Sequence, residues 1–282
     1  MSLLSSLEIE EIVSKNKPSS SAFIFRHLPL TTGITLGNFF RRILLNHISG
    51  IAIVGAEIAD KNGPLKTKVD ASWEGIDKPI PWYLIVKLKE VVFVEKEARE
   101  GIFRVEMVVE NNTKKERIIT AGDFSEVREV EIKNPELELT TLSSGGKLNL
   151  KLYCQKSWGY QEKKEKKDRE EMKKAIKEYF PNEEDNIIAF DTNYSPVKLV
   201  NSQVDKVIVD LTKEEEKLTL TIDTNGAIEP RQALQEALEI SQQSFRHISQ
   251  LISDNSINKK RKREELEPKP TAEKVKRIKI LK

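Results

Sequence analysis

The stretch Thr31-Thr-Gly-Ile-Thr-Leu-Gly-Asn-Phe-Phe-Arg-Arg-Ile-Leu-Leu-Asn-His-Ile-Ser-Gly50 decides the fold of this chain. From Thr35, the expected N-cap, to Gly50, the expected stop, it has the period of an amphipathic helix. One face is apolar and is expected to lie on a core: Leu36, Phe39, Phe40, Ile43 and Leu44. The opposite face carries Asn38, Arg41, Arg42 and Leu45. It is either a solvated surface or, because Leu45 lies on it, a docking face for a partner.

The composition allows one large or two moderate domains. Of the 282 residues, 38% are apolar and 33% are charged, so some stretches contribute nothing to a core. Residues 253–282 hold eleven Lys or Arg against five Asp or Glu, and the remainder holds 36 against 40. We therefore expect a mildly acidic folded part and a disordered basic tail.

Several classes of protein are disfavoured by the sequence. Cys154 is the single cysteine, which excludes a disulfide framework and indicates a reducing compartment. No apolar run reaches the roughly 18 residues of a membrane span, so no membrane partner is expected. The stretch Met1–Glu11 lacks a basic region and becomes acidic at once, unlike a secretory or transit peptide.

Along the chain, the predicted elements are first helices and strands, then strands alone, then strands and a helix again. Residues 7–14 and 22–28 alternate as a hairpin, and Ile51–Ile58 is typical of a strand buried on both sides. Further strands are expected at Tyr83–Val94, Ile102–Glu110, Glu116–Thr120, Val127–Ile132, Leu137–Leu142 and Leu148–Gln155, and later at Ile187–Thr192, Lys206–Leu211 and Leu218–Asp223.

The charged stretch 161–186 separates the two strand-rich parts. It offers apolar residues only in its second half, so we expect a solvated insertion that is helical at most there: Met172, Ala175, Ile176, Tyr179 and Phe180.

A last helix is predicted from Pro230 to about Ile252. Its apolar residues follow a spacing close to a heptad, with Ser241 at one position: Leu234, Leu238, Phe245, Ile248 and Ile252. Such a helix packs on its own domain or pairs with a second copy.

These observations predict an α+β chain. A domain built from both ends (1–53 plus 187–252) is interrupted by an inserted β-rich domain (54–160) and the charged insertion (161–186), and it is followed by the tail (253–282).

The search for catalytic chemistry finds no candidate. His27, His47 and His247 are scattered, and no phosphate-binding loop or nucleophile motif is present. We expect no catalytic, cofactor-binding or metal-binding residue. The stretch Ser157-Trp-Gly-Tyr160 is either a base-stacking platform or, as we favour, a cap on the β-rich domain. The basic tail either contacts nucleic acid or only solubilises the chain.

Three functions remain open on these grounds: an assembly subunit that dimerises and docks large partners, a nucleic-acid-binding module acting through its tail, and an enzyme with an unrecognised site. The missing catalytic site disfavours the enzyme, and the acidic body disfavours the nucleic-acid module.

The stretch Gly33–Leu45 resembles the alpha subunit of bacterial-type RNA polymerase. Further motifs follow in the order of that family: Ile119–Phe124, Val130–Pro135, Gly146–Tyr153, Gly159-Tyr160, Tyr194-Ser-Pro-Val197 and Thr224–Leu234.

The resemblance implies a homodimer that assembles the beta and beta-prime subunits of the polymerase. It implies dimer contacts through the two helices, at Leu36, Phe39, Phe40, Ile43, Leu234, Leu238, Phe245, Ile248 and Ile252. It also implies docking of large subunits at Asn38, Arg41, Arg42 and Leu45, with a second contact at Tyr194, Pro196 and Val197. Arg42 is the residue expected to engage beta, since a guanidinium holds a carboxylate or carbonyl with two hydrogen bonds.

Some features depart from the family pattern. The stretch Gly75–Lys89 keeps Leu88-Lys89 but not the usual acidic pair, and 161–186 is longer than the usual linker. The family's C-terminal DNA-binding domain is expected to be absent, so DNA contact is at most indirect or through the tail. Pro230–Leu234 and Leu88–Phe93 resemble plastid-encoded versions, which implies the plastid stroma, with a bacterial cytoplasm as the alternative.

Overall fold

A computed structural model describes residues 6–60, 63–64, 81–98, 100–163, 165–182, 186–210 and 213–253. The chain divides into two compact units, Met1–Ala237 and Leu238–Lys282. The predicted α+β class is confirmed, since helices alternate with antiparallel sheets. Of the predicted tail, all residues after 253 lie outside the described part.

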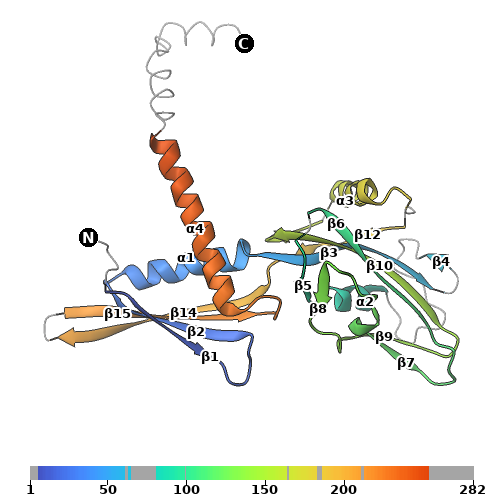
Figure 1. The fold of residues 1–282 in the computed structure, drawn as a ribbon, viewed down its shortest axis with the longest axis horizontal. Coiled ribbons are helices and arrows are strands. Elements are labelled where there is room, and N and C mark those ends of the chain that lie inside the picture. Colours follow the sequence, from blue (N-terminus) through green and yellow to red (C-terminus); the bar gives the residue numbers. More distant parts are fainter. Residues whose placement is uncertain are drawn as a thin grey trace, which may run out of the picture. The chain divides into compact units, whose positions relative to one another are not determined.

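Strands from distant parts of the sequence form one antiparallel sheet (Figure 1). Its order is β1 (Glu8–Val13), β2 (Ser20–Leu28), β15 (Lys213–Thr224) and β14 (Val197–Asp210). The first two strands form the predicted hairpin. In β15 the apolar Leu218, Leu220 and Ile222 are buried, whereas Thr219 and Thr221 between them are partly exposed. The alternation shows that one face of the sheet lies on a core.

Helix α1 (Thr32–Asn46) packs on this sheet, against β14 and β15. It begins before the expected N-cap, Thr35. The residue at the N-cap position is Thr31, which has a φ of 70° and no side-chain capping hydrogen bond. Gly50 does not end the helix, because the helix stops at Asn46 and Gly50 lies in the following strand.

A second antiparallel sheet contains β12 (Ile188–Ala189), β3 (Ser49–Asp60), β10 (Lys147–Trp158) and β6 (Ile102–Glu110), with β4 (Gly63–Pro64) paired to β3. β6 has the predicted bounds. Ile53 and Val54 of β3 are both buried, in different clusters on the two faces, so the prediction of a doubly buried strand is confirmed.

Three short ladders complete the strands that the structure describes. They pair β5 (Phe93–Glu95) with β8 (Val130–Ile132), β7 (Arg117–Thr120) with β9 (Glu138–Leu142), and β11 (Tyr160–Gln161) with β13 (Thr192–Asn193); a 3-10 turn spans Ala121–Asp123.

The prediction of a strand at Tyr83–Val94 is wrong. Helix α2 (Pro81–Leu88) occupies its first half, and only Phe93–Glu95 is extended. Leu84 and Leu88, four residues apart, are both buried in the large core with Phe93. The apolar run fits a strand and a helix equally well, and burial of one helical face decides between them.

Helix α3 (Lys166–Tyr179) shows that the charged insertion is not a solvated segment. The helix spans the first half as well as the second, and the backbone N–H of Glu165 donates to the Asp168 carboxylate in a capping box. Met172 and Ile176 are buried with Val54 and Ile187 on the second face of the β3 sheet.

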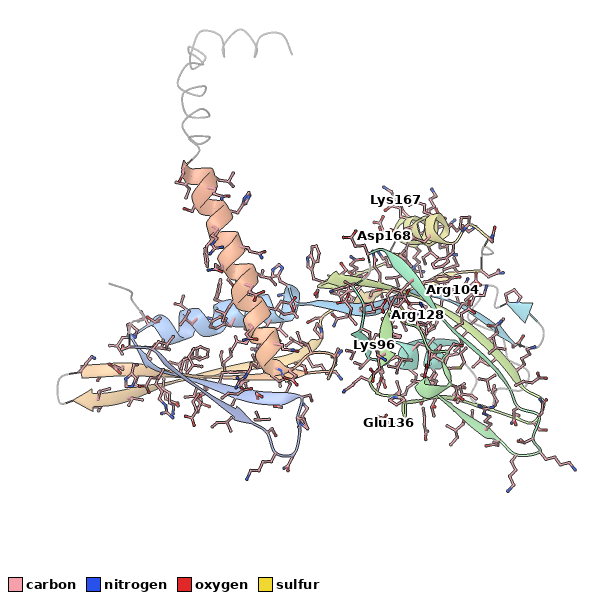
Figure 2. The ribbon with its side chains drawn as sticks, in the orientation of Figure 1. Lys96, Arg104, Arg128, Glu136, Lys167 and Asp168 are labelled. Carbon is pink, nitrogen blue, oxygen red and sulfur yellow. The ribbon has the colours of Figure 1, made fainter. Side chains whose placement is uncertain are left out.

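The residues after Tyr179 continue this packing. The ring of Phe180 lies 5.5 Å from that of Tyr153, and the guanidinium of Arg104 lies 5.3 Å from the centre of the Phe180 ring. Figure 2 shows Lys167 and Asp168 on α3 and Arg104 on the sheet that α3 covers.

The last helix, α4 (Pro230–Ser253), matches its predicted bounds closely. The domain boundaries expected at 53/54, 160/161 and 186/187 stay a prediction. β3 runs without interruption through the first of them.

Candidate functional site

The face of α1 that lies on the sheet is built from small residues as well as large ones. Gly33, Gly37, Phe40 and Leu44 are buried, and the Phe40 ring stacks on Phe25 with 5.8 Å between ring centres. A Cβ on Gly37 would lie 3.0 Å from the Cβ of Ser202, and one on Gly33 would lie 3.0 Å from Val204. The two glycines therefore allow α1 to lie close to β14.

A buried carboxylate holds the start of α1. Glu216 of β15 is 5% exposed, and its two carboxylate oxygens accept hydrogen bonds from the backbone N–H groups of Thr31 and Gly33, at 2.9 and 2.8 Å. These N–H groups have no partner within the helix, and a negative charge suits a helix N-terminus. Glu216 replaces the capping hydroxyl that the sequence led us to expect at Thr35. Glu216 lies 183 positions from Gly33 in the sequence, so no local pattern could predict this role.

Most of the predicted docking face is exposed, although one of its side chains reaches back to the sheet. Asn38, Arg41 and Arg42 are exposed, and Leu45 is half-buried. The Arg41 guanidinium donates to the backbone carbonyl of Val200 on β14, which leaves Arg42 as the more outward cation of the pair. Ile34, which we did not single out, is 59% exposed one turn before Asn38 and continues the apolar part of this face.

The predicted dimer residues of α1 fall into two groups. Phe40 is 4% exposed and belongs to the core, whereas Leu36, Phe39 and Ile43 are half-buried on the flank of the helix. Only the second group offers apolar surface to another molecule.

The predicted dimer residues of α4 also differ in burial. Leu234 is buried in the first unit. In the second unit, every described residue from 242 to 253 is exposed. The apolar side chains there are 47–61% exposed: Leu238, Phe245, Ile248, Leu251 and Ile252. Such a surface on one helix is unusual for a chain that stays alone.

The segment Tyr194–Val197 is held firmly in the first unit. Tyr194, Pro196 and Val197 are buried, so exposed neighbours such as Asn193 and Lys198 form its surface. The Tyr194 hydroxyl donates to the side-chain oxygen of Gln155 at 3.2 Å, and burial raises the pKa of Tyr194 to about 12. A phenol with this pKa stays protonated at neutral pH.

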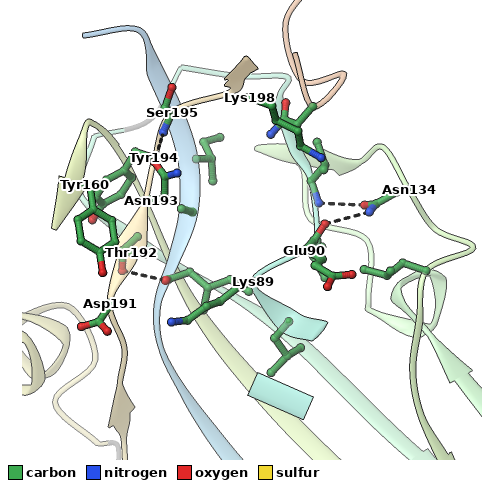
Figure 3. A pocket seen from close by; sticks show the side chains of 18 residues that line it. Lys89, Glu90, Asn134, Tyr160, Asp191, Thr192, Asn193, Tyr194, Ser195 and Lys198 are labelled. Atoms are coloured by element: carbon green, nitrogen blue, oxygen red, sulfur yellow. Dashed lines mark hydrogen bonds between the residues drawn. The ribbon is translucent and has the colours of Figure 1, made fainter. Parts of the chain in front are cut away.

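A cavity of about 510 Å³ lies beside this segment (Figure 3). Lys89, Glu90, Asp191 and Lys198 bring charges of both signs to its lining, over apolar residues of β3 and of the loop after α2. The side chain of Asn134 bonds the backbone of Glu90 and Val92, at 3.0 and 2.9 Å, and so fixes that loop. The fold thus brings Lys89 and the Tyr194 segment to the same cavity, which the linear sequence could not reveal.

The described residues contain no group of three or more His, Cys, Asp or Glu side chains arranged to hold a metal ion. No helix in the described part of the chain is long and apolar enough to cross a membrane. Cys154 is buried, and burial raises the pKa of its thiol. His27 lies 2.7 Å from a carboxylate oxygen of Glu215, whereas His47 and His247 are exposed.

The first unit thus holds an antiparallel sheet with α1 packed on it, and the second unit holds a helix rich in exposed apolar residues. The chain belongs to the RNA polymerase Rpb3/Rpb11 dimerisation domain family, whose model matches residues 30–245.

Individual relatives make the comparison more specific. The chain is 31% identical over 245 residues to the DNA-directed RNA polymerase subunit alpha of Desulforamulus reducens, which covers 85% of this chain and 70% of the relative. It is 31% identical to that of Thermus thermophilus and 27% identical to that of Synechocystis, over 65% and 66% of their lengths. The resemblance to the N-terminal region of RNA polymerase alpha subunits is thereby confirmed.

Proposed function

We propose that the chain forms a homodimer that scaffolds the assembly of the beta and beta-prime subunits of a DNA-directed RNA polymerase. In this proposal the chain supplies no catalytic residue and binds no cofactor, and RNA synthesis takes place on its partners. The observation that carries the proposal is the exposed apolar surface of α4 in a chain of the dimerisation-domain family.

The dimer would form through α4 and the flank of α1. Phe245 is 59% exposed, and covering that part of a phenylalanine side chain removes roughly 100 Å² from water, a gain of about 2–3 kcal/mol. We expect Phe245→Asp to give monomers at micromolar concentration in sedimentation experiments. Gln243→Asp adds the same charge on the opposite side of the helix and is the matched control. A Phe245→Asp variant that stays dimeric would refute this contact.

The large subunits would dock on the outward face of α1 and beside the Tyr194 segment. Arg42 is the candidate contact with beta, and its loss would weaken binding by about 2–4 kcal/mol. We expect Arg42→Ala to remain a dimer but to capture much less beta in a pull-down. Arg26→Ala removes an exposed arginine of β2 that pairs with Glu10 and should leave capture unchanged. Equal recovery of beta by the wild type and Arg42→Ala would contradict the assignment.

The second contact would use the cavity lined by Lys89 and Lys198, whose cations suit acidic side chains of a partner. Purification of the native complex tests the whole proposal, because beta and beta-prime should co-purify with the dimer. The dimer alone should not incorporate nucleotides.

For the location we propose the plastid stroma, with a bacterial cytoplasm as the alternative. The proposal rests on the resemblance of Pro230–Leu234 and Leu88–Phe93 to plastid-encoded versions. Detection of the coding sequence in purified plastid DNA would support the plastid stroma. Its detection in a bacterial chromosome would support the bacterial cytoplasm.

A further inference from the structure

Two aromatic side chains are left uncovered at one end of the second sheet. Trp158 ends β10 and Tyr160 begins β11, and they are 60% and 61% exposed. The capping role predicted for this stretch requires both side chains to be buried against the β-rich core. The exposure contradicts that interpretation, and the two aromatic residues need another explanation.

The pair lies where α1 ends. Trp158 is the register partner of Ser49, the first residue of β3 after α1. Gly159 has a φ of 74°, and a Cβ there would lie 3.3 Å from the backbone oxygen of Asn46, in the last turn of α1. The aromatic residues therefore lie close to the C-terminal end of α1, the helix that carries Arg42 and Leu45.

The other side of the pair meets the cavity. Tyr160 is paired with Asn193 and lines the cavity, next to the Tyr194 segment (Figure 3). The backbone N–H of Tyr194 donates to the carbonyl of Gly159 at 2.9 Å, which fixes the turn between the two aromatic residues. Trp158 and Tyr160 thus connect the two surfaces that we propose for docking.

The charges around the pair limit the kind of partner. Arg42 is exposed on α1 and favours an acidic side chain of the partner there, whereas the cavity lining holds Lys89 and Lys198 together with Glu90 and Asp191. Such a mixture of charges suits a protein surface, which carries both signs, better than a phosphate backbone, which is negative throughout. Tryptophan and tyrosine are the residue types most enriched among energetically dominant interface contacts.

We propose that Trp158 and Tyr160 anchor an apolar side chain of the beta subunit and so join the α1 contact to the cavity. This inference rests on the proposed function. It assigns to these two residues a share of the binding affinity comparable with that of Arg42.

The experiment uses the full-length dimer and purified beta subunit. The chain has three tryptophans, so Trp73→Phe together with Trp82→Phe leaves Trp158 as the single fluorescent indole. On addition of beta, we expect its emission to shift to shorter wavelength and its quenching by acrylamide to fall. In the otherwise unchanged chain, Trp158→Ala should weaken beta capture by about 30-fold or more, the range of a dominant contact. Ile118→Ala, which truncates a 54% exposed residue of β7, should have no effect.

The outcomes separate this inference from the proposed function. If Arg42→Ala reduces capture but Trp158→Ala does not, the scaffold function stands and the anchor is refuted. If the wild-type dimer captures no beta, the scaffold function fails and the anchor fails with it. A Trp158 response to a thymine oligonucleotide instead of beta would replace the anchor with a base-stacking site. Monomers of Trp158→Ala in sedimentation would assign the residue to the dimer contact and would equally overturn the proposal.

Discussion

Replacement of Gly50 by alanine tests the close approach of two backbone segments. A Cβ at this position would overlap the carbonyl oxygen of Tyr194 and would lie 3.3 Å from the ring of Pro196. The obstacle is backbone, so no side-chain rotation relieves it. Gly50 does not have the left-handed conformation, so the effect of the substitution is steric alone.

The magnitude follows from this geometry. Overpacking typically destabilises a protein by about 1–3 kcal/mol, and a clash with backbone falls at the upper end. Because 1 kcal/mol corresponds to roughly 2–4 °C for 150–250 residues, we expect Gly50→Ala to lower the Tm by about 6–12 °C. The same variant should capture less beta, because the Tyr194–Val197 segment must move.

Gly145 supplies the matched control. It has a φ of 74° and no atom within 4 Å of the position of a Cβ, so Gly145→Ala introduces backbone strain without a clash. We expect it to cost about 1 kcal/mol and to leave beta capture unchanged. Differential scanning calorimetry and a pull-down measure both quantities. An equal loss of Tm in the two variants, with unchanged capture, would refute the reasoning.

Three further predictions concern stability. Ile176→Ala should destabilise the chain by about 2–5 kcal/mol and raise hydrogen exchange in α3; if the Tm is unchanged, α3 is not packed on the sheet. In Glu216→Gln the backbone N–H of Thr31 or Gly33 faces an amide NH2 group instead of an acceptor oxygen. We expect the free energy of unfolding, measured in urea, to fall by about 1–3 kcal/mol. An unchanged urea midpoint would contradict the role of the Glu216 carboxylate at the start of α1. Hydrogen bonds from the Lys17 ammonium, the larger cause, and from the Ser20 hydroxyl lower the pKa of Asp223 in the folded chain. The stability that this carboxylate contributes is therefore fully present above its unfolded pKa of about 3.9. It is lost as the pH falls through the lower folded pKa. Lys17→Ala should reduce the loss of stability at acidic pH. An unchanged pH dependence of the free energy of unfolding would contradict this prediction.

Periodic patterns predicted much of the fold because each is local. The alternation of Ile102–Glu110 and the helical period from Pro230 onward appear in the structure with nearly the predicted bounds. The run Tyr83–Val94 failed because its apolar residues suit both periods, and only the surrounding core selects a helix for the first half.

The candidate site was only partly predictable. The helical period separated Arg42 from the apolar face of α1 and placed Phe40 on that face. A period does not tell which part of an apolar stripe is covered by the sheet, and Phe40, which the resemblance assigned to the dimer contact, is buried within the chain. The carboxylate of Glu216 and the cavity beside Lys89 depend on contacts between distant parts of the chain, which no local pattern contains.

The sheet formed by β1, β2, β15 and β14 has a consequence for synthesis of the chain on the ribosome. The bond between Gly33 and Glu216 joins residues 183 positions apart, and Ser20 and Asp223 are 203 apart. The start of α1 therefore lacks its carboxylate, and β2 lacks its second neighbour, β15, until nearly all of the first unit has been translated. A prematurely terminated nascent chain would expose the apolar face of α1 to proteases and chaperones.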